Sequence, residues 1–404
     1  MAEQQFTFGE LVKAGDMTFG DGYRTKKSEH GKPGLPILRV AEVQDGTIRP
    51  EFTDYVSDAY RAAMGAKVSR CGDVVLTTKG TVGRVAIIPS GSPEFIYSPQ
   101  VCFFRVSEEG RLDSKYLYYW FKTPEFWDQA GSRKSQTDMA DYLNLSDIRS
   151  LAITVPGRVQ QQAVVNILGA LDDKISSNDR MIAVTLELAD AQYAHAVQGL
   201  EFGPETFGSV ATVVGGGTPS TKAEEYWGGG IAWATPTDVT ALSAPYLFET
   251  SRTITSDGLE NCASQLYPAH SIFMTSRATI GAFALPQMPA AVNQGFIVVL
   301  PPAEELRWWL LHEMRSRVDE MISLANGSTF LELSRKNFKA MPIRLADDQA
   351  VAEFAQAVSP LHGRAAQAAA ESRALAALRD TLLPQLMSGK LCAHDAEKIV
   401  EDAV

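Results

Sequence analysis

Short apolar runs, bounded by glycine, proline and serine, recur along the chain and predict β-strands. They are rich in β-branched and aromatic residues, which fit the half-buried surface of a sheet. The first group consists of "DVVLTT" (73–78), "RVAIIP" (84–89) and "VCFFRV" (101–106). A second group consists of "SIFMTS" (271–276), "AFALP" (282–286) and "FIVVL" (296–300). We therefore expect two separate sheets.

Longer stretches near each group of strands combine aliphatic and aromatic residues with polar ones and predict helices. These stretches are "DSKYLYYWFKTPEFWDQA" (113–130) and "AEELRWWLLHEMRSRVDEMISLA" (303–325). Each region therefore has the pattern of a mixed α/β domain of roughly 150 residues, a common size for one domain.

The two regions also resemble each other, with four landmarks in the same order. Their spacing is nearly constant, since Gly83 and Gly281 are 198 residues apart and Ile37 and Trp233 are 196 apart. Four matches in register indicate a duplicated domain. The pairs are "LPILRVAEVQDG" with "IAWATPTDVTAL", "GDVVLTTKGTVGRVAIIP" with "HSIFMTSRATIGAFALP", "YSPQVCFFRV" with "AVNQGFIVVL", and "KYLYYWFKT" with "LRWWLLHEM".

A long helix with a heptad seam is predicted after the first copy. Alternating steps of four and three residues are typical of one helix packing along another. The asparagine in this seam is of a kind that can fix the register of the pair. The seam positions are Val164, Leu168, Leu171, Ile175, Asn178, Ile182, Thr185 and Ala189.

A second long helix is predicted after the second copy, with an alanine-rich middle that favours helix and close packing. We expect Pro360 to kink or break it, and Pro384 to mark its last turn. The alternative to a coiled coil is that each helix packs on its own domain. The positions in similar steps are Val351, Phe354, Val358, Leu361, Ala365, Ala368, Ser372, Leu375, Leu382 and Leu386.

Composition narrows the class of protein. The 404 residues are 45% hydrophobic, enough for two cores. No apolar run approaches the roughly 18 residues that span a bilayer. The N-terminus lacks the pattern of a signal peptide, and the four cysteines show no CxxC spacing. We therefore expect a cytoplasmic protein with no membrane association, no zinc site and no disulfide framework.

The order of domain, long helix, domain and long helix resembles the specificity (S) subunit of type I restriction–modification enzymes. The resemblance rests on the duplicated strand turns, on "LNLSDIRSLAITVPGRVQQQAVVNILGALDDKI", and on the C-terminal "ELSRKNFKAMPIRLADDQAVAEFAQAV" with "LRDTLLPQLMSGKL". It implies a mixed α/β (α+β) fold with two target recognition domains and two antiparallel helices forming a coiled coil. The implied boundaries are 1–155, 156–200, 201–345 and 346–404.

The resemblance also implies the partners. Each recognition domain would read half of a split double-stranded DNA site. Two methyltransferase (modification) subunits would bind, with a restriction/translocase subunit joining later. The entries to the long helices, "VPGRVQQQ" and "IRLADDQ", depart from the family pattern because they lack its Glu-Gln pair.

A spacer role for the helices agrees with simple geometry. A helix over 160–196 would be roughly 55 Å long at 1.5 Å per residue. That length corresponds to about 16 base pairs of B-DNA. The unread gap between the half-sites would then depend on the helices and not on the reading domains.

The chain carries few signs of catalysis. "GGGTPSTK" (215–222) has the wrong spacing for a nucleotide loop. The amino-methyltransferase signature is missing, and the histidines show no pairing that suggests a metal. Asp172–Asp173–Lys174 has the form of a nuclease triplet, but we interpret it as a solvated helix face. We therefore expect a non-catalytic protein without cofactors.

Two other functions stay open on the sequence alone. One is a self-contained DNA methyltransferase or nuclease, which the missing motifs oppose. The other is a structural adaptor whose repeated domains bind protein and not nucleic acid. The net charge of −11 fits DNA binding only if basic groups share a face or a partner supplies charge. Residues 1–155 are nearly balanced, with 19 Lys and Arg against 20 Asp and Glu.

Candidate DNA contacts are the side chains that suit phosphates or base edges and lie in predicted loops. We interpret Gly80, Gly83 and Gly281 as turn residues and not as ligand contacts. In the first domain the candidates are Arg24, Lys26, Lys27, Lys79, Thr81, Arg84, Arg133, Lys134 and Gln136. In the second domain they are Lys222, Thr237, Asp238, Arg277, Thr279, Asn293, Gln294, Asn326 and Ser328.

Overall fold

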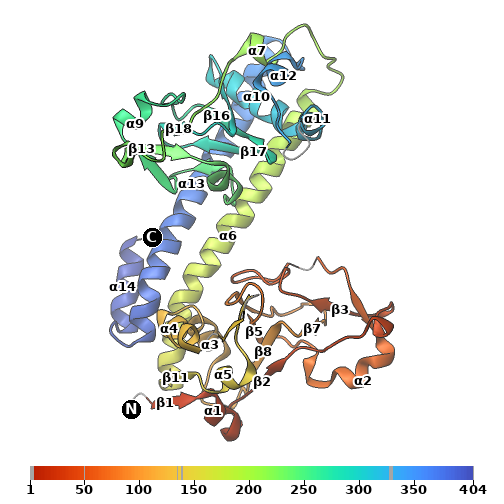
Figure 1. The fold of residues 1–404 in the computed structure, drawn as a ribbon, viewed down its shortest axis with the longest axis vertical. Coiled ribbons are helices and arrows are strands. Elements are labelled where there is room, and N and C mark those ends of the chain that lie inside the picture. Colours follow the sequence, from red (N-terminus) through yellow and green to blue (C-terminus); the bar gives the residue numbers. More distant parts are fainter. Residues whose placement is uncertain (1–3, 50, 134, 138–139, 327–330, 404) are drawn as a thin grey trace. The chain divides into compact units, whose positions relative to one another are not determined.

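The chain divides into two structural units. A computed structural model describes residues 4–49, 51–133, 135–137, 140–326 and 331–403. The first unit combines Met1–Asp173 with Ala376–Val404, and the second unit is Lys174–Leu375. Figure 1 shows the elements of both.

The first unit contains a four-stranded antiparallel sheet and a three-stranded sheet. The larger has the order β2-β8-β5-β6 and the smaller the order β4-β3-β7. In the smaller sheet β3 is antiparallel to β4 and parallel to β7. The strands are β2 (Met17–Asp21), β3 (Gly34–Leu38), β4 (Tyr55–Ser57), β5 (Val74–Thr77), β6 (Val85–Ile87), β7 (Ile96–Tyr97) and β8 (Val101–Val106).

The second unit repeats this topology. Its larger sheet, β12-β19-β16-β17, carries β14 as an extra edge strand, and its smaller sheet has the order β15-β13-β18. Here too the middle strand, β13, has one antiparallel and one parallel neighbour. The duplicated domain is confirmed. The strands are β12 (Thr212–Val214), β13 (Trp227–Ala234), β14 (Tyr246–Leu247), β15 (Arg252–Ile254), β16 (Ile272–Arg277), β17 (Thr279–Pro286), β18 (Ala290–Val292) and β19 (Phe296–Leu300).

All six strands predicted from the apolar runs are present, but each predicted helix is divided in two. The first forms α3 (Ser114–Trp120) and α4 (Pro124–Arg133), and the second forms α10 (Glu304–Ser316) and α11 (Val318–Ser323). Proline lacks an N–H group and fits the first turn of a helix, so Pro124 begins α4 instead of continuing α3.

The two sheets of each unit enclose matching apolar cores. In the first unit Leu38 and Tyr97 pack with Val75 and Phe103. The second unit has the corresponding cluster of Ala234, Val292, Phe273 and Val298. Each sheet therefore buries one face against the other, as the alternation of its side chains requires.

Each copy closes by pairing its start with its end. In the first unit β1 (Gln4–Thr7) is antiparallel to β11 (Ala152–Val155). In the second unit the backbone N–H of Ile343 donates to the carbonyl of Glu205 at 2.9 Å. Shorter elements complete the units: α1 (Phe8–Ala14), α2 (Arg61–Met64), β9 (Ser135–Thr137), β10 (Ala140–Tyr142), α5 (Leu145–Arg149), α7 (Phe207–Val210), α8 (Pro236–Thr240), α9 (Ser256–Glu260), α12 (Arg335–Ala340) and α14 (Ala393–Ala403).

The first long helix, α6 (Arg158–Ala196), is continuous over 39 residues. Its predicted seam is confirmed, because the seam positions are buried or half-buried along its length. Asn178 is only 3% exposed, and its amide donates to Glu371 at 2.9 Å. The buried asparagine thus has a defined partner, as a register-fixing residue requires.

The second long helix, α13 (Asp348–Met387), is also continuous, so the prediction that Pro360 breaks it is wrong. Pro360 is exposed. Water can therefore reach that side of the helix, where the missing N–H leaves a carbonyl without its usual partner. Pro384 lies in the last turn, as predicted.

Within each unit the two long helices lie side by side (Figure 1). In the second unit Asn178 of α6 contacts Glu371 of α13, while Tyr193, further along α6, packs on Phe354, which is earlier in α13. The two helices therefore run in opposite directions. This confirms an antiparallel coiled coil over the alternative of separately packed helices.

Asp173 and Lys174 are exposed, as predicted for the acidic triplet, but Asp172 is half-buried. Its carboxylate accepts hydrogen bonds from Arg379 on α13 and from the Tyr119 hydroxyl, both at 2.8 Å. These partners are far away in sequence, so the helical pattern alone does not reveal them.

In the described part of the chain, no helix is both long and apolar enough to cross a membrane.

Candidate nucleic-acid interface

The two duplicated strand turns are tight and solvent-facing. They are the β5–β6 turn, residues 78–83, and the β16–β17 turn, the equivalent residues 276–281, which include the end of β16 and the start of β17. Both contain two left-handed residues at equivalent places, with φ of +79° at Gly80 and +60° at Ala278, then +98° at Gly83 and +87° at Gly281. Gly80 and Gly83 lie in a turn, as interpreted, whereas Gly281 is the third residue of β17.

Gly83 and Gly281 are also required for packing. A Cβ on Gly83 would lie 2.0 Å from the Trp127 ring, and one on Gly281 would lie 2.5 Å from Val318. Gly80 has open space around its Cα. Each turn is thus pressed against a helix at one end and free at the other.

We expect Gly83→Ala to destabilise the first unit by more than about 2 kcal/mol, because it adds a clash to left-handed strain. Gly80→Ala is the matched control, with strain alone and an expected cost of about 1 kcal/mol. Urea unfolding of both variants measures the difference. Equal costs would show that contact with Trp127 does not constrain the turn.

A second segment lies beside each turn. Lys79 forms a β-bridge with Tyr142, the last residue of β10, and its ammonium lies 6.0 Å from that ring. In the second unit Arg277 forms a β-bridge with Glu332 and pairs with its carboxylate at 2.8 Å. Asn326 is bridged to Glu332 as well. The hairpin after α4 and the segment after α11 are therefore structural equivalents.

A third segment, the turn before β8 or β19, joins the same place. The N–H of Thr78 donates to the carbonyl of Gln100 at 2.9 Å, and that of Ser276 donates to Gly295 at 2.8 Å. Asn293 Oδ1 accepts from the N–H of Gly295 at 2.8 Å, which fixes this turn in the second unit.

The basic loop of the first unit has a glycine-rich counterpart in the second. The N–H of Tyr23 donates to Tyr97, and that of Gly217 donates to Val292, at 2.7 and 3.0 Å. Cβ atoms on Gly22 or Gly216 would collide with these same backbones. "GGGTPSTK" is therefore the structural equivalent of the loop that carries Arg24.

Most of the candidate DNA contacts lie on these neighbouring loops and are accessible. Asn293 is half-buried. The exposed ones are Arg24, Lys26, Lys27, Lys79, Thr81, Lys222, Thr237, Arg277, Thr279, Gln294 and Asn326. Arg133 is the last residue of α4 and Gln136 lies in β9. Lys134 and Ser328 lie outside the described residues.

Two half-buried candidates, Arg84 and Asp238, make several hydrogen bonds within the protein. The Arg84 guanidinium donates to the carbonyls of Val40 and Val43 at 3.5 and 3.3 Å. The Asp238 carboxylate caps α8 by accepting from Thr235, and it also accepts from the N–H of Ser251. Burial alone would raise the pKa of Asp238, but these hydrogen bonds outweigh burial and lower it.

Two polar residues at the same junctions were missed by the sequence analysis. Gln100 is exposed next to the first turn, and the Thr218 hydroxyl donates to Gln294 Oε1 at 2.6 Å. The spacing of the repeat was no signal for Thr218, because its offset of 196 to 198 residues aligns Arg24 with Ser220 or Lys222, and only the backbone hydrogen bonds of the preceding residues, Tyr23 and Gly217, show that Thr218 is the equivalent of Arg24.

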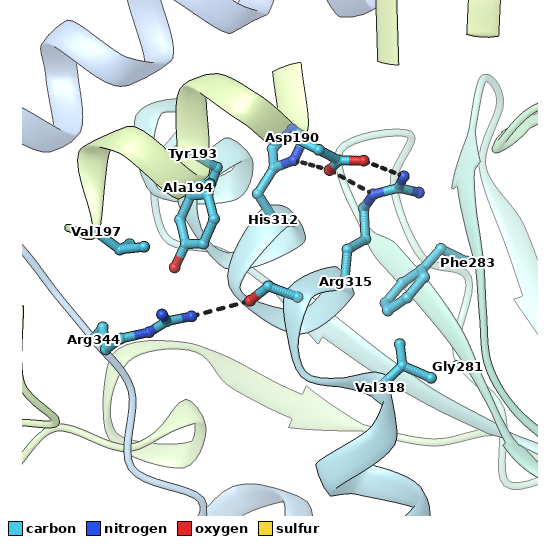
Figure 2. A pocket seen from close by; sticks show the side chains of 11 residues that line it. Asp190, Tyr193, Ala194, Val197, Gly281, Phe283, His312, Arg315, Val318 and Arg344 are labelled. Atoms are coloured by element: carbon cyan, nitrogen blue, oxygen red, sulfur yellow. Dashed lines mark hydrogen bonds and ion pairs between the residues drawn. The ribbon is translucent and has the colours of Figure 1, made fainter. Parts of the chain in front are cut away.

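The second unit also contains a cavity of about 550 Å³ bordered by α6, α10 and β17. Figure 2 shows the Asp190 carboxylate between His312 and Arg315. His312 Nδ1 lies 2.7 Å from Asp190, and His312 Nε2 lies 2.9 Å from His362 Nε2. Two histidines thus pair, which their spacing in the sequence did not indicate.

This cluster has the contacts of a packed structural core. His362 is 2% exposed and its ring stacks on Trp308. Burial lowers the pKa of His362 to about 3, with nearby positive groups adding to the effect. Across the described ranges, no three His, Cys, Asp or Glu side chains form a group that could hold a metal ion.

The sequence matches one known domain family twice. The pattern of the type I restriction modification DNA specificity domain fits residues 4–186 and again residues 201–362. These two ranges together cover most of the chain.

Individual proteins with similar sequences are specificity subunits of type I restriction enzymes. The specificity subunit of the type I restriction enzyme MjaIX from Methanocaldococcus jannaschii is 35% identical over 136 residues, which are 33% of this chain and 32% of that protein. The EcoR124I/EcoR124II specificity subunit from Escherichia coli is 25% identical over 261 residues, 59% of this chain and 62% of that protein. The matches thus span less than two thirds of these relatives.

A solved structure shares the fold over nearly the whole chain. It is the S subunit of a type I restriction-modification system from M. genitalium, with a TM-score of 0.58. The sequences are 16% identical, and 96% of each chain is covered. The two-copy architecture with long helices is therefore found in a protein of distant sequence.

Proposed function

The chain belongs to the family of type I restriction modification DNA specificity domains, and from this premise we propose that it is the DNA-specificity subunit of a type I restriction–modification complex. In this role it binds a split DNA target and catalyses nothing itself. Methylation and cleavage belong to its partners.

The observation that carries the proposal is the duplication of one domain. Each copy gathers loops with exposed lysine, arginine, threonine and amide side chains beside the same two strands. Two equivalent reading surfaces suit a target with two separate halves. The weakly acidic total charge does not oppose this, because association depends on the charges near the DNA.

The side chains on these loops divide into two roles by their chemistry. Lys79 and Arg277 occupy equivalent positions and suit phosphate oxygens or the edge of guanine. Asn326 and Gln294 present amides, which suit adenine. The bases read in each half depend on these loops, whose sequences differ between the copies.

We further propose the assembly around the subunit. Two methyltransferase subunits bind it, a restriction/translocase subunit joins the complex, and the assembly acts in the cytoplasm. The helices α6 and α13 set the number of unread base pairs between the half-sites. The proposed domain boundaries remain 1–155, 156–200, 201–345 and 346–404.

The function is tested by selection from a random DNA pool with the chain assembled with its cognate methyltransferase subunits. The expected product is a motif of two short conserved blocks separated by a gap of fixed length. Recovery of one continuous motif would contradict the proposal. DNA binding that is absent, or insensitive to salt, would favour the structural adaptor.

Lys79→Ala and Arg277→Ala are expected to weaken DNA binding by the assembled complex about tenfold or more each. If the residue binds a phosphate, the slope of log affinity against log salt falls by about one. If it binds a base, selectivity falls in one half-site only. Fluorescence anisotropy at several salt concentrations distinguishes the two cases.

Lys398→Ala on α14 is the matched control, since it removes an exposed lysine outside both repeated domains. We expect its affinity to equal that of the unmodified chain. A loss as large as that of Lys79→Ala would mean that only total charge matters, and the assignment of the turns would be wrong.

A further inference from the structure

Each duplicated turn begins at a buried threonine whose hydroxyl reaches across the turn. Thr77 Oγ1 accepts a hydrogen bond from the N–H of Arg84 at 2.9 Å, and Thr275 Oγ1 accepts one from the N–H of Ala282 at 3.0 Å. Both threonines are fully buried. The contact is therefore repeated with the fold and not incidental to one copy.

The hydroxyl replaces a backbone partner that the strand ladder does not provide. The register between β16 and β17 shifts between Met274 and Ser276, so the ladder is irregular at Thr275. An irregularity of this kind leaves a backbone group without its usual partner and redirects the chain. The threonine hydroxyl pairs with the N–H of Ala282 and so stabilises the irregular turn.

The residue after each threonine then connects the neighbouring loops. Thr78 donates its N–H to Gln100 on one side, and its carbonyl accepts from the N–H of Leu143 at 3.0 Å on the other. Three loop segments of the first unit thus meet at one buried residue.

The second unit has the same junction. Ser276 donates its N–H to Gly295, and its carbonyl accepts from the N–H of Leu333 at 2.9 Å. The next residue along is Arg277, one of the proposed DNA contacts. A change in the backbone at Thr275 would therefore move all three loops together.

We infer that Thr77 and Thr275 are positioning residues, each setting the arrangement of the DNA-reading loops in its own copy. The inference rests on the proposed function for the link to DNA, but the effect on the loops stands without it. Neither threonine is expected to touch DNA, because both are buried.

Thr275→Val tests the inference, because valine keeps the branched shape and removes the hydroxyl. In the free chain, hydrogen exchange at the Ala282 amide should become about tenfold faster or more, as expected when a hydrogen bond worth about 1.4 kcal/mol is lost. In the assembled complex, selectivity should fall about tenfold in one half-site only. Thr275→Ser keeps the hydroxyl and should restore both. Thr77→Val and Thr77→Ser repeat the test in the other copy.

Unchanged exchange at Ala282 in a folded Thr275→Val chain, and at Arg84 in Thr77→Val, would overturn the inference. Equal loss in the serine and valine variants would overturn it too, since packing and not the hydroxyl would then be responsible. If exchange quickens while both valine variants and Arg277→Ala leave the DNA target unchanged, the threonines set the loops as inferred, and the proposed DNA-reading role fails instead.

Discussion

Glu313→Ala is expected to destabilise the second unit by about 3–5 kcal/mol, the cost of leaving a buried charge unpaired. Glu313 is completely buried on α10. Its carboxylate accepts from Arg317 at 2.9 Å, from Arg344 at 2.8 Å and from the Tyr193 hydroxyl. Removing it leaves Arg344 and the Tyr193 hydroxyl without this partner. Hydrogen exchange of the α10 amides in increasing urea measures the loss.

Glu320→Ala is the matched control, because Glu320 pairs with the same Arg317 at 2.7 Å but has a side chain that is 44% exposed. An ion pair so open to water contributes at most about 1 kcal/mol. Glu313→Gln should lie between the two, since the amide keeps the shape and one acceptor oxygen. Equal losses in Glu313→Ala and Glu320→Ala would show that burial of the carboxylate does not matter.

Acidification is expected to destabilise the second unit below about pH 6.5. The pKa of His362 is about 3 in the folded chain and 6.5 when the residue is unconstrained. Between these values the unfolded chain binds a proton that the folded chain does not. The contribution of neutral His362 to the free energy of unfolding is therefore fully present above pH 6.5. It falls by about 1.4 kcal/mol per pH unit as pH decreases, so that about 2–3 kcal/mol is lost at about pH 4.5.

Asp190 extends the loss to lower pH. Burial alone would raise the pKa of Asp190, but hydrogen bonds from His312 and Arg315 lower it. Its contribution is therefore present above about pH 4 and is lost below. Urea unfolding at several pH values, compared with His362→Gln, tests the assignment. Between about pH 4.5 and pH 6.5, the free energy of unfolding of the variant should depend on pH less steeply, by about 1.4 kcal/mol per pH unit. Parallel curves would mean that another group is responsible.

The architecture could be predicted to a large extent because two kinds of pattern carry it. The strands follow from local apolar runs, and the helical seams follow from steps of three and four residues, so both need only neighbouring positions. The repeat added the long-range information, because a second copy of a pattern is evidence that one unit folds twice. Asn178 shows the limit of these patterns, since its place in the seam was predicted but its partner Glu371 was not.

The side-chain junctions could not be predicted, because they depend on contacts between distant segments. His312 and His362 are 50 residues apart and meet only when α10 and α13 pack together. Asp238 was proposed as a DNA contact from its residue type, whereas its capping hydrogen bonds depend on the start of a five-residue helix. Thr275 looked like an ordinary strand residue, and only the irregular ladder shows what its hydroxyl does.

The helix α13 has a consequence for how the protein is made. Its last segment, from Ala376 on, belongs to the first unit, where Arg379 pairs with Asp172. During synthesis the ribosome therefore completes the rest of the first unit long before this last partner emerges. Until then the seam residues Leu168 and Leu171 of α6 lack the second helix of the coiled coil. The nascent chain must keep this apolar stripe from aggregating for more than two hundred residues of translation, which makes chaperone dependence an expected property of its biogenesis.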